Sequence, residues 1–255
     1  MQFKDLNLHP SILKAVEEEG YTTPTPIQEQ AVPSVLMGRD VLGCAQTGTG
    51  KTAAFAMPIL HQLEQRDISG PRKISALILT PTRELAIQID DSFKTYGKYL
   101  KVRTLVIFGG VGQQPQVDAL RRGTDVLIAT PGRLLDLVNQ RLLDLGHISL
   151  FVLDEADRMF DLGFIVDIRY LMRRLPPPEA RLSMLFSATL AQRVLELAYE
   201  HMNDAQLVRI EPEKVTADRV RQVIYYPAME EKAGLLVGLL RKINAKRTII
   251  FVNMK

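Results

Sequence analysis

A glycine-rich loop that ends in Gly-Lys-Thr is the feature that most constrains how this chain can fold. It follows the short apolar run Val41–Cys44, leads into a helix-forming sequence, and reads Ala45, Gln46, Thr47, Gly48, Thr49, Gly50, Lys51 and Thr52. Glycines let the backbone turn its N–H groups inward, and a helix N-terminus adds partial positive charge. A strand, this loop and a helix therefore predict a phosphate-binding cradle.

Two side chains of this loop have expected roles in such a cradle. Lys51 is expected to reach the β- and γ-phosphates of a nucleotide, and the Thr52 hydroxyl to bind Mg²⁺. The usual pattern begins with a glycine where this chain has Ala45. The alternative interpretation is a glycine-rich connection in an α/β sheet that binds nothing.

Apolar runs and helical patterns alternate along most of the chain. The runs suited to buried strands are Val41–Cys44, Ile74–Leu79, Val102–Phe108, Asp125–Ala129, Leu150–Leu153, Ser183–Phe186 and Leu207–Ile210. The helical patterns lie at 10–19, 26–36, 52–65, 84–99, 111–121, 134–139, 165–174 and 191–201. This alternation predicts an α/β fold with a doubly wound parallel sheet, whose ligands bind beyond the carboxyl ends of the strands.

Composition narrows the class of protein further. The chain is 46% hydrophobic and 24% charged, as globular proteins are. No apolar run approaches the ~20 residues of a membrane span, no signal peptide is evident, and the single Cys44 suits a reducing compartment, so we expect a cytoplasmic protein. The net charge of +3 arises from residues 219–255, which hold eight basic and two acidic side chains. A nucleic-acid site on the main body must therefore be argued from local placement.

Carboxylates follow the apolar run that ends at Leu153. An acidic residue at the end of such a strand is what a phosphate-loop enzyme needs to hold Mg²⁺ through its water shell, and we assign that role to Asp154. Glu155, the next residue, is placed to orient or deprotonate an attacking water. The alternative interpretation is a solvated helix start, where acidic residues are common.

Two further strand ends resemble each other, since each is followed by Thr-Pro and then by an arginine in the first helical turn. The residues concerned are Pro81, Thr82 and Arg83 in one case, and Thr130, Gly132 and Arg133 in the other. Free N–H groups at two helix starts could bind backbone phosphates, and an arginine is disfavoured there by the helix dipole unless it has a function. Two anion sites on one sheet edge fit a polynucleotide better than a small metabolite. Two ordinary capped helices are the alternative.

The order of these motifs resembles the DEAD-box ATP-dependent RNA helicases of superfamily 2. The tetrad Asp154-Glu155-Ala156-Asp157 is the signature of that family, and Ala45 is the residue that the family carries. The other matching motifs are Gly20–Gln28 with Phe3 upstream, Ala45–Thr52, Pro81–Leu85, Gly109-Gly110, Thr130–Arg133 and Ser187–Thr189. The resemblance covers about residues 3–210. Within the family, residues 157–164 and 184–189 look most like the bacterial RNA helicase B type, which acts in RNA decay.

The resemblance implies roles that the residues alone leave open. Gln28 would read the adenine edge and Tyr21 would pack on the ring, so that ATP is the nucleotide. Asp157, Ser187 and Thr189 would couple hydrolysis to strand separation. The residues implied to grip the RNA backbone are Pro81, Thr82, Arg83, Gly110, Thr130, Gly132 and Arg133. An RNA-decay endoribonuclease is an implied partner, through regions outside this chain.

The resemblance and the composition together divide the chain into three parts. Residues 1–210 would form a RecA-like ATP-binding domain, 211–218 a polar linker, and 219–255 the start of a second RecA-like domain. In the last part we expect a strand at 222–226, a helix at 230–243 and a strand at 247–252. Because helicases of this family close two such domains around ATP and RNA, one domain alone is expected to bind ATP·Mg²⁺ and RNA weakly, to hydrolyse ATP slowly and not to unwind.

Two other functions stay open from the sequence. One is a non-catalytic RNA clamp gated by ATP, and the other is a DNA translocase of the same superfamily. Lys51, Asp154 and Glu155 argue against the clamp, and Gln28 and the tetrad argue against the DNA translocase. The apolar residues Leu235, Leu236 and Leu239 could also pair with another chain.

Overall fold

The computed structural model describes residues 1–66, 72–211, 223–244 and 247–252. The chain divides into two compact units, Met1–Pro212 and Glu213–Lys255, and each is described by itself. Among the described residues no helix is both long and apolar enough to cross a membrane.

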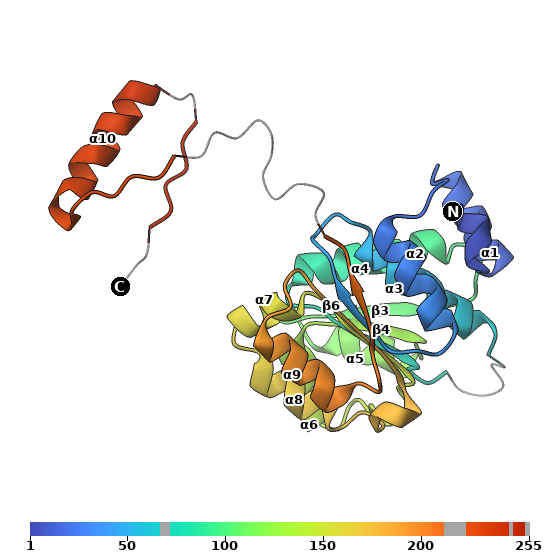
Figure 1. Ribbon diagram of the computed structural model, residues 1–255. Helices are drawn as coiled ribbons and strands as arrows, with labels where there is room; N and C mark the ends of the chain where they lie inside the picture. The colour runs from blue at the N-terminus through green and yellow to red at the C-terminus, as the bar shows by residue number, and fades with distance from the viewer. Residues whose placement is uncertain (67–71, 212–222, 245–246, 253–255) are drawn as a thin grey trace. The chain divides into compact units, whose positions relative to one another are not determined.

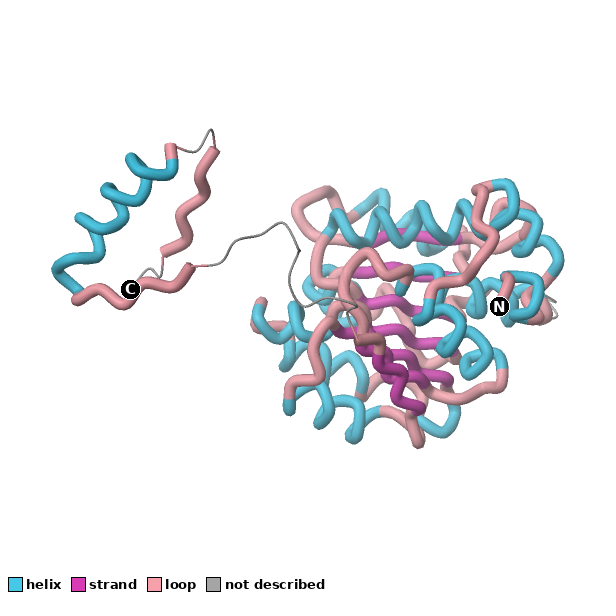
Figure 2. Tube along the Cα trace, turned by 45° about the horizontal axis from the view of Figure 1, so that its top comes forward, coloured by secondary structure: helices cyan, strands magenta, loops and turns pink. Residues whose placement is uncertain are grey.

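A seven-stranded sheet, parallel throughout, forms the centre of the first unit (Figures 1 and 2). Its strands lie in the order β3-β4-β2-β5-β6-β1-β7. They are β1 (Val41–Cys44), β2 (Ala76–Leu79), β3 (Thr104–Ile107), β4 (Val126–Ala129), β5 (Leu150–Leu153), β6 (Leu182–Ser187) and β7 (Gln206–Arg209). From β1 the chain passes to β2 and then to β3 at the edge of the sheet, where it turns back through β4, β5 and β6 to β7. Helices connect these strands on both faces, so the sheet is doubly wound, as predicted.

Helices cover both faces of this sheet. One face carries α1 (Pro10–Glu18), α2 (Pro26–Leu36), α3 (Lys51–Glu64) and α4 (Arg83–Tyr96). The other carries α5 (Gln114–Arg121), α6 (Pro131–Asn139), α7 (Ala156–Asp161), α8 (Ile165–Met172) and α9 (Gln192–His201). Figure 1 shows α2, α3 and α4 on one side of the strands and α6, α8 and α9 on the other. Short 3₁₀ turns lie at Phe3–Leu6 and Pro178–Ala180.

Successive side chains of each strand point to opposite faces of the sheet, so each face has its own hydrophobic core. In β2, for example, Ala76 and Ile78 pack towards α1–α4, whereas Leu77 and Leu79 pack towards α5–α9. All four residues of this strand are buried, which explains why its sequence is apolar throughout rather than alternating. The residues of β1, β4, β5 and β6 are also all buried, and of these strands β6 alone includes polar side chains, those of Ser183 and Ser187.

One buried carboxylate ties the strands together at their amino ends. Asp40 precedes β1 and accepts hydrogen bonds from the backbone N–H groups of Ser183 and Asn203, each at 2.7 Å. Burial raises the pKa of Asp40, while these two N–H groups act in the opposite direction. The carboxylate thus joins β1 to the start of β6 and to the turn before β7.

All seven strands predicted from the sequence are present, with ends that shift by one or two residues. The bounds of β1, β5 and α2 are those predicted. Helix α5 begins at Gln114 rather than at Val111, because the glycines of that junction form a loop. A helix start at Asp154 and Glu155 was the alternative interpretation to a metal site. The structure has such a helix, α7, directly after these two carboxylates.

The second unit contains α10 (Lys232–Ile243), preceded by a 3₁₀ turn at Met229–Glu231. This helix matches the one predicted at 230–243. The strands predicted at 222–226 and 247–252 are not formed in the described residues 223–228 and 247–252, and the predicted linker lies almost wholly outside the described residues. An isolated parallel strand has no partner for its backbone N–H and C=O groups, so an extended sequence without a neighbouring strand stays irregular.

Candidate nucleotide and nucleic-acid site

The carboxyl edge of the sheet brings together all the strand ends that were predicted to carry chemistry. The neighbouring strands β5, β6 and β1 lead into Asp154, Ser187 and the Ala45–Thr52 loop, and form a first half of this edge. The neighbouring strands β3, β4 and β2 lead into the loops that carry the other predicted contacts, and form a second half. The sheet order therefore separates the predicted nucleotide residues from the predicted RNA residues.

The phosphate loop turns on two glycines in left-handed conformations. Gly48 has φ of 85° and Gly50 has φ of 92°, and α3 begins immediately afterwards at Lys51. An added Cβ at Gly50 would lie 2.4 Å from Nε2 of Gln28, so glycine is required there by sterics as well as by φ. The start of the loop is fixed to β6, because the Ala45 N–H donates to the carbonyl oxygen of Ser187 at 3.0 Å.

Lys51 points its ammonium group into this region without a partner. The residue is only 6% exposed, and among the described residues its Nζ has no hydrogen-bond acceptor. A buried ammonium without a hydrogen-bond acceptor is costly, since it has lost its hydration. The site is therefore built for an anion that lies against Nζ.

Asp154 is the complementary buried charge. It is 2% exposed, and burial is the main cause that raises its pKa to about 6, with the nearby Glu155 charge acting in the same direction and the Lys51 charge opposing both. The alternation of β5 directs position 154 to the face that α3 covers, so the carboxylate and Lys51 share one side of the sheet.

The oxygen groups of this half suit a magnesium ion. The Asp154 carboxylate and the half-buried Thr52 hydroxyl are hard donors of the kind that Mg²⁺ prefers. Among the described residues no group of three or more His, Cys, Asp or Glu side chains could hold a metal alone. This donor set fits a cation that completes its shell with phosphates and water.

Glu155 adopts an unusual conformation that holds it at the turn between β5 and α7. Its φ of 52° is left-handed, and its N–H donates to Oδ1 of Asp154 at 3.0 Å. Its carboxylate pairs with Arg158, whose Nη1 donates to Oε2 at 3.1 Å. Arg158 is not among the site residues predicted from the sequence. Its i, i+3 spacing from Glu155, the N-cap residue of α7, is the signal that could have found it.

A pocket of about 260 Å³ adjoins the phosphate loop. Its lining includes Tyr21, Gln28, Gly50 and Thr52, together with Tyr96, which the sequence analysis did not identify. Tyr21 is half-exposed, so one ring face is available for stacking. The predicted adenine residues and the phosphate loop thus border one cavity.

Gln28 already makes two hydrogen bonds inside the protein. Its Oε1 accepts from the Thr25 N–H at 3.0 Å, and its Nε2 donates to the carbonyl oxygen of Gly50 at 3.1 Å. An amide side chain has two N–H donors and two acceptor lone pairs, so one of each remains. One N–H donor and one acceptor lone pair are the two groups that hydrogen bonding to the edge of adenine would require.

Asp157 and Thr189 connect the acidic tetrad to the end of β6. Oδ2 of Asp157 accepts from the Thr189 N–H at 3.1 Å and from its hydroxyl at 3.2 Å. The Thr189 N–H also lies 3.4 Å from the hydroxyl of buried Ser187. These three predicted residues therefore form one connected group.

The second half of the edge carries two arginines that lean towards the loop after β3. Arg83, at the start of α4, places its guanidinium 4.5 Å from the centre of the Phe108 ring. Arg133, on α6, donates from Nη2 to the Val111 carbonyl at 2.9 Å, while its buried Nη1 has no partner among the described residues. A guanidinium that stacks on a ring keeps its N–H groups free for a phosphate.

The other predicted RNA residues lie around these arginines. Thr82 caps α4, since its hydroxyl accepts from the Leu85 N–H at 3.3 Å, and Pro81 precedes it. Thr130 occupies the N-cap position of α6, but its side chain accepts no hydrogen bond from the helix. Gly132, in the first turn of this helix, is exposed. Gly110 has φ of 78° and open space around its Cα, so a ligand backbone could approach closely.

The two halves of the edge meet at the pairing of β2 with β5. The Asp154 N–H donates to the Leu79 carbonyl oxygen at 2.9 Å, and the Thr80 N–H donates to the Ala129 carbonyl oxygen at 3.0 Å. Backbone hydrogen bonds thus run from Asp154 towards the loops that carry Arg83 and Arg133. We call the Asp154–Leu79 bond the seam of the site.

Known proteins resemble this chain over its whole length. An ATP-dependent RNA helicase RhlB of Xanthomonas axonopodis pv. citri is 51% identical over 257 residues, which cover 99% of this chain and 45% of that protein. A protein of the same name from Shigella dysenteriae serotype 1 is 47% identical over 257 residues, covering 100% of this chain and 61% of that protein. The chain thus spans between 45% and 61% of the length of these curated relatives.

Solved structures and a family profile agree with these relatives. A DEAD box protein from Methanococcus jannaschii is 34% identical, with a TM-score of 0.76 over 94% of this chain and 63% of that one. A hypothetical ATP-dependent RNA helicase from Sulfolobus tokodaii is 32% identical, with a TM-score of 0.71 over 80% of this chain and 57% of that one. Residues 25–197 match the profile of the DEAD/DEAH box helicases. With the geometry described above, these matches show that the chain belongs to the DEAD/DEAH box helicase family.

Proposed function

We propose that residues 1–210 are the ATP-binding domain of an ATP-dependent RNA helicase. The observation that carries this proposal is the unpaired Lys51 ammonium beside the buried Asp154 carboxylate. A triphosphate with its Mg²⁺ would supply what each lacks, namely phosphate oxygens for Lys51 and positive charge for Asp154. The names of the relatives support RNA as the second ligand.

The adenine would enter the pocket between Tyr21 and Gln28. The free donor and acceptor of Gln28 would pair with the adenine edge, and a guanine would leave both unpaired. Because Gln28 also holds the Gly50 carbonyl, base recognition and the shape of the phosphate loop are connected through one side chain. ATP is therefore the expected nucleotide.

Thr52 and Asp154 would hold the Mg²⁺, which when bound neutralises phosphate charge. Glu155 would orient the attacking water and accept its proton. Its ion pair with Arg158 has to loosen for this, because a carboxylate engaged by a guanidinium is a poorer base. Asp157, Ser187 and Thr189 would carry the change at the tetrad towards the RNA half.

RNA would lie across the loops after β2, β3 and β4. Exposed helix N-termini and the Arg83 and Arg133 guanidinium groups would hold phosphates rather than bases, so binding would depend on salt and little on sequence. The second unit would be the start of another RecA-like domain. Since a single domain cannot close around both ligands, we expect residues 1–255 to bind ATP and RNA weakly and not to unwind a duplex.

Replacement of Lys51 by methionine tests the nucleotide site. Methionine keeps most of the volume but removes the positive charge near the buried Asp154 carboxylate, so the pKa of Asp154 should rise further. Affinity for ATP·Mg²⁺ should fall about 10- to 100-fold, the value of a charged hydrogen bond of about 1.5–3 kcal/mol. The control is Lys73→Met, an exposed lysine at the other end of the sheet. Equal ATP affinity in both variants would contradict the proposal.

Three finer expectations belong to the whole protein. From the motif resemblance described in the sequence we infer a role in RNA decay, in the cytoplasm, with an endoribonuclease as partner through regions outside this chain. The presence of Lys51, Asp154 and Glu155 at one edge of the sheet supports turnover, and nothing in the described part of the site favours a non-catalytic clamp or a DNA translocase. Unwinding by residues 1–255 alone would contradict the assignment of a single domain.

A further inference from the structure

Four exposed basic side chains gather at the end of the sheet opposite the candidate site. Lys73 precedes β2, Lys101 and Arg103 precede β3, and Arg122 lies between α5 and β4. Among the described residues, none of these four side chains forms an ion pair with an acidic side chain. We name these four residues the basic rim.

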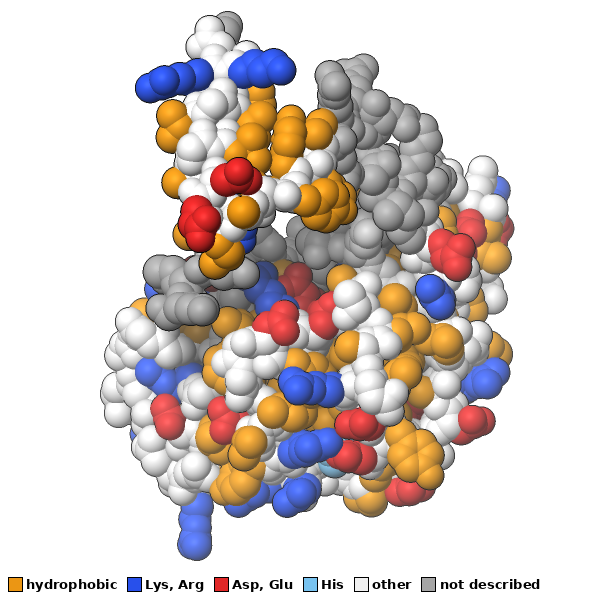
Figure 3. Space-filling model, turned by 60° about the vertical axis from the view of Figure 1, so that its left-hand side comes forward, with side chains coloured by type: hydrophobic (Ala, Val, Ile, Leu, Met, Phe, Trp, Pro, Cys, Tyr) orange, Lys and Arg blue, Asp and Glu red, His pale blue; other side chains and the backbone are white. Residues whose placement is uncertain are grey.

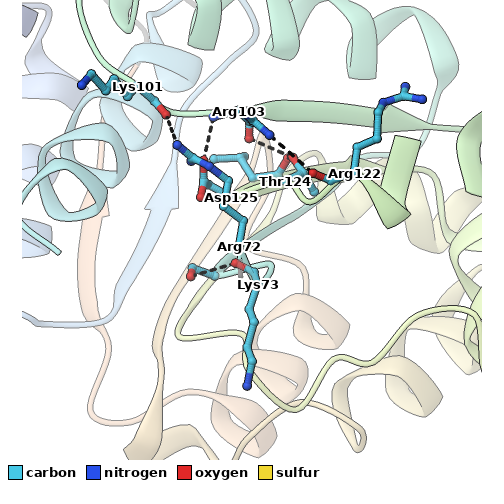
Figure 4. Close-up of polar contacts among 9 residues, drawn as sticks. Arg72, Lys73, Lys101, Arg103, Arg122, Thr124 and Asp125 are labelled. Carbon is cyan, nitrogen blue, oxygen red and sulfur yellow. Dashed lines mark hydrogen bonds and ion pairs between the residues drawn. The ribbon is translucent and has the colours of Figure 1, made fainter. Parts of the chain in front are cut away.

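A single buried acid holds the rim in shape and does not neutralise it. The Asp125 carboxylate pairs with the Arg72 guanidinium and accepts from the Arg103 N–H at 2.7 Å (Figure 4). Arg72 also donates to the Lys101 carbonyl at 3.0 Å, and Arg103 donates to the Arg122 carbonyl at 3.4 Å. The three loops are therefore tied together before any ligand binds, and ordering them costs little on binding.

The rim is a local feature rather than a result of overall charge. Residues 1–212 hold 23 basic and 25 acidic side chains, so the first unit is slightly acidic. On the face around α7–α9, basic and acidic side chains lie close to one another (Figure 3). Four cations without acidic partners would therefore attract a polyanion to this place in particular.

The direction of the side chains excludes a small ligand. In Figure 4 the charged ends of Lys101 and Arg122 point away from each other, and Lys73 extends away from both. One phosphate or one nucleotide could not contact them together. A chain of regularly spaced negative charges could, because successive phosphates would meet successive cations.

Helix α5 connects the rim to the RNA half of the candidate site. The helix follows the Gly109–Gly110 loop, and Arg122 caps its last turn. Its eight residues span about 12 Å along the helix axis, which is the length that RNA must cover between Gly110 and Arg122. Strand β3 beside it is the edge of the sheet, and three of its four residues are only partly buried.

We propose that the basic rim is a second contact for the phosphate backbone of single-stranded RNA whose first contact is at the carboxyl edge. The proposal rests on the proposed function. RNA held by the first contact would present its flanking segment to the rim at high effective concentration, so even weak phosphate contacts would add affinity. Only an RNA long enough to reach past α5 would gain from them.

The test compares a short RNA of about 6 nucleotides with a long one of about 16 on the 255-residue chain. The triple variant Lys101→Gln, Arg103→Gln and Arg122→Gln removes three rim charges. It should weaken binding of the long RNA and lower its log–log salt slope by about 2, at about 0.7 per phosphate contact. Binding of the short RNA should not change.

A control variant removes three exposed arginines elsewhere, through Arg39→Gln, Arg173→Gln and Arg174→Gln. An equal effect of the control on the long RNA, or no effect of the rim variant, would overturn the proposal. So would binding of an acidic peptide, polyglutamate, that requires the rim while the RNA affinities do not. If neither RNA binds the unaltered chain, the proposed function fails instead.

Discussion

Replacing Gly50 by alanine separates the two constraints that act on the phosphate loop. The first constraint is backbone conformation, because φ is +92° at Gly50 and +85° at Gly48. A left-handed residue with a Cβ costs about 1–2 kcal/mol at either position. The second constraint acts only at position 50, where the new Cβ would lie 2.4 Å from Nε2 of Gln28 and 2.8 Å from Oγ1 of Thr25.

The contact at position 50 cannot be relieved cheaply. Gln28 is 5% exposed and makes two hydrogen bonds, to the Gly50 carbonyl and from the Thr25 N–H. Displacing its amide would lose both, at about 0.5–1.5 kcal/mol each. We therefore expect Gly50→Ala to destabilise the fold by about 2–5 kcal/mol and Gly48→Ala, which meets nothing within 4 Å, by about 1–2 kcal/mol.

Urea unfolding and ATP binding measure the two effects. A double-mutant cycle with Gln28→Ala should show a coupling of about 1–3 kcal/mol with Gly50→Ala, since removal of the amide removes the closer of the two contacts, and none with Gly48→Ala. ATP affinity should fall more for Gly50→Ala than for Gly48→Ala. Equal destabilisation by the two alanines, or zero coupling to Gln28, would refute the steric argument.

Three further substitutions test other parts of the molecule. Glu155→Gln should retain ATP·Mg²⁺ binding and slow single-turnover hydrolysis at least about 100-fold, and an unchanged rate would remove Glu155 as the base. Asp40→Ala should lower the free energy of unfolding in urea by about 2–5 kcal/mol, because two backbone N–H groups lose their acceptor; a change below about 0.5 kcal/mol would contradict this. Phe108→Ala should weaken RNA binding about 2- to 5-fold by releasing Arg83, at about 0.5–1 kcal/mol, with Phe108→Tyr as the control that keeps binding.

The sheet and the positions of its functional loops could be predicted because local signals were unambiguous. Strand β5 is an apolar run closed by charged residues, and α2 begins at a Thr-Pro step and ends before Gly38. Parallel strands then place every loop of interest at one edge. The order of strands in the sheet, which separates the two halves of the site, depends on long-range packing that no local pattern encodes.

Side-chain partners were the part that the sequence could not supply. The pairing of Glu155 with Arg158 and the bonds of Gln28 to Thr25 and Gly50 depend on rotamers within a finished structure. The strands expected in the second unit failed for another reason. Their apolar pattern is compatible with a sheet, but pattern alone does not provide the neighbouring strand that a sheet requires.

The seam between β2 and β5 has a consequence for how communication in this domain can be measured. The bond from the Asp154 N–H to the Leu79 carbonyl consists of main-chain atoms only, so substitution of either side chain leaves it intact. An alanine scan would report little coupling between the candidate nucleotide and RNA halves even if this bond carried most of it. Replacement of the Asp154 amide by an ester, which deletes the donor and also weakens the Leu153 carbonyl as an acceptor, would expose a contribution that conventional mutagenesis leaves hidden.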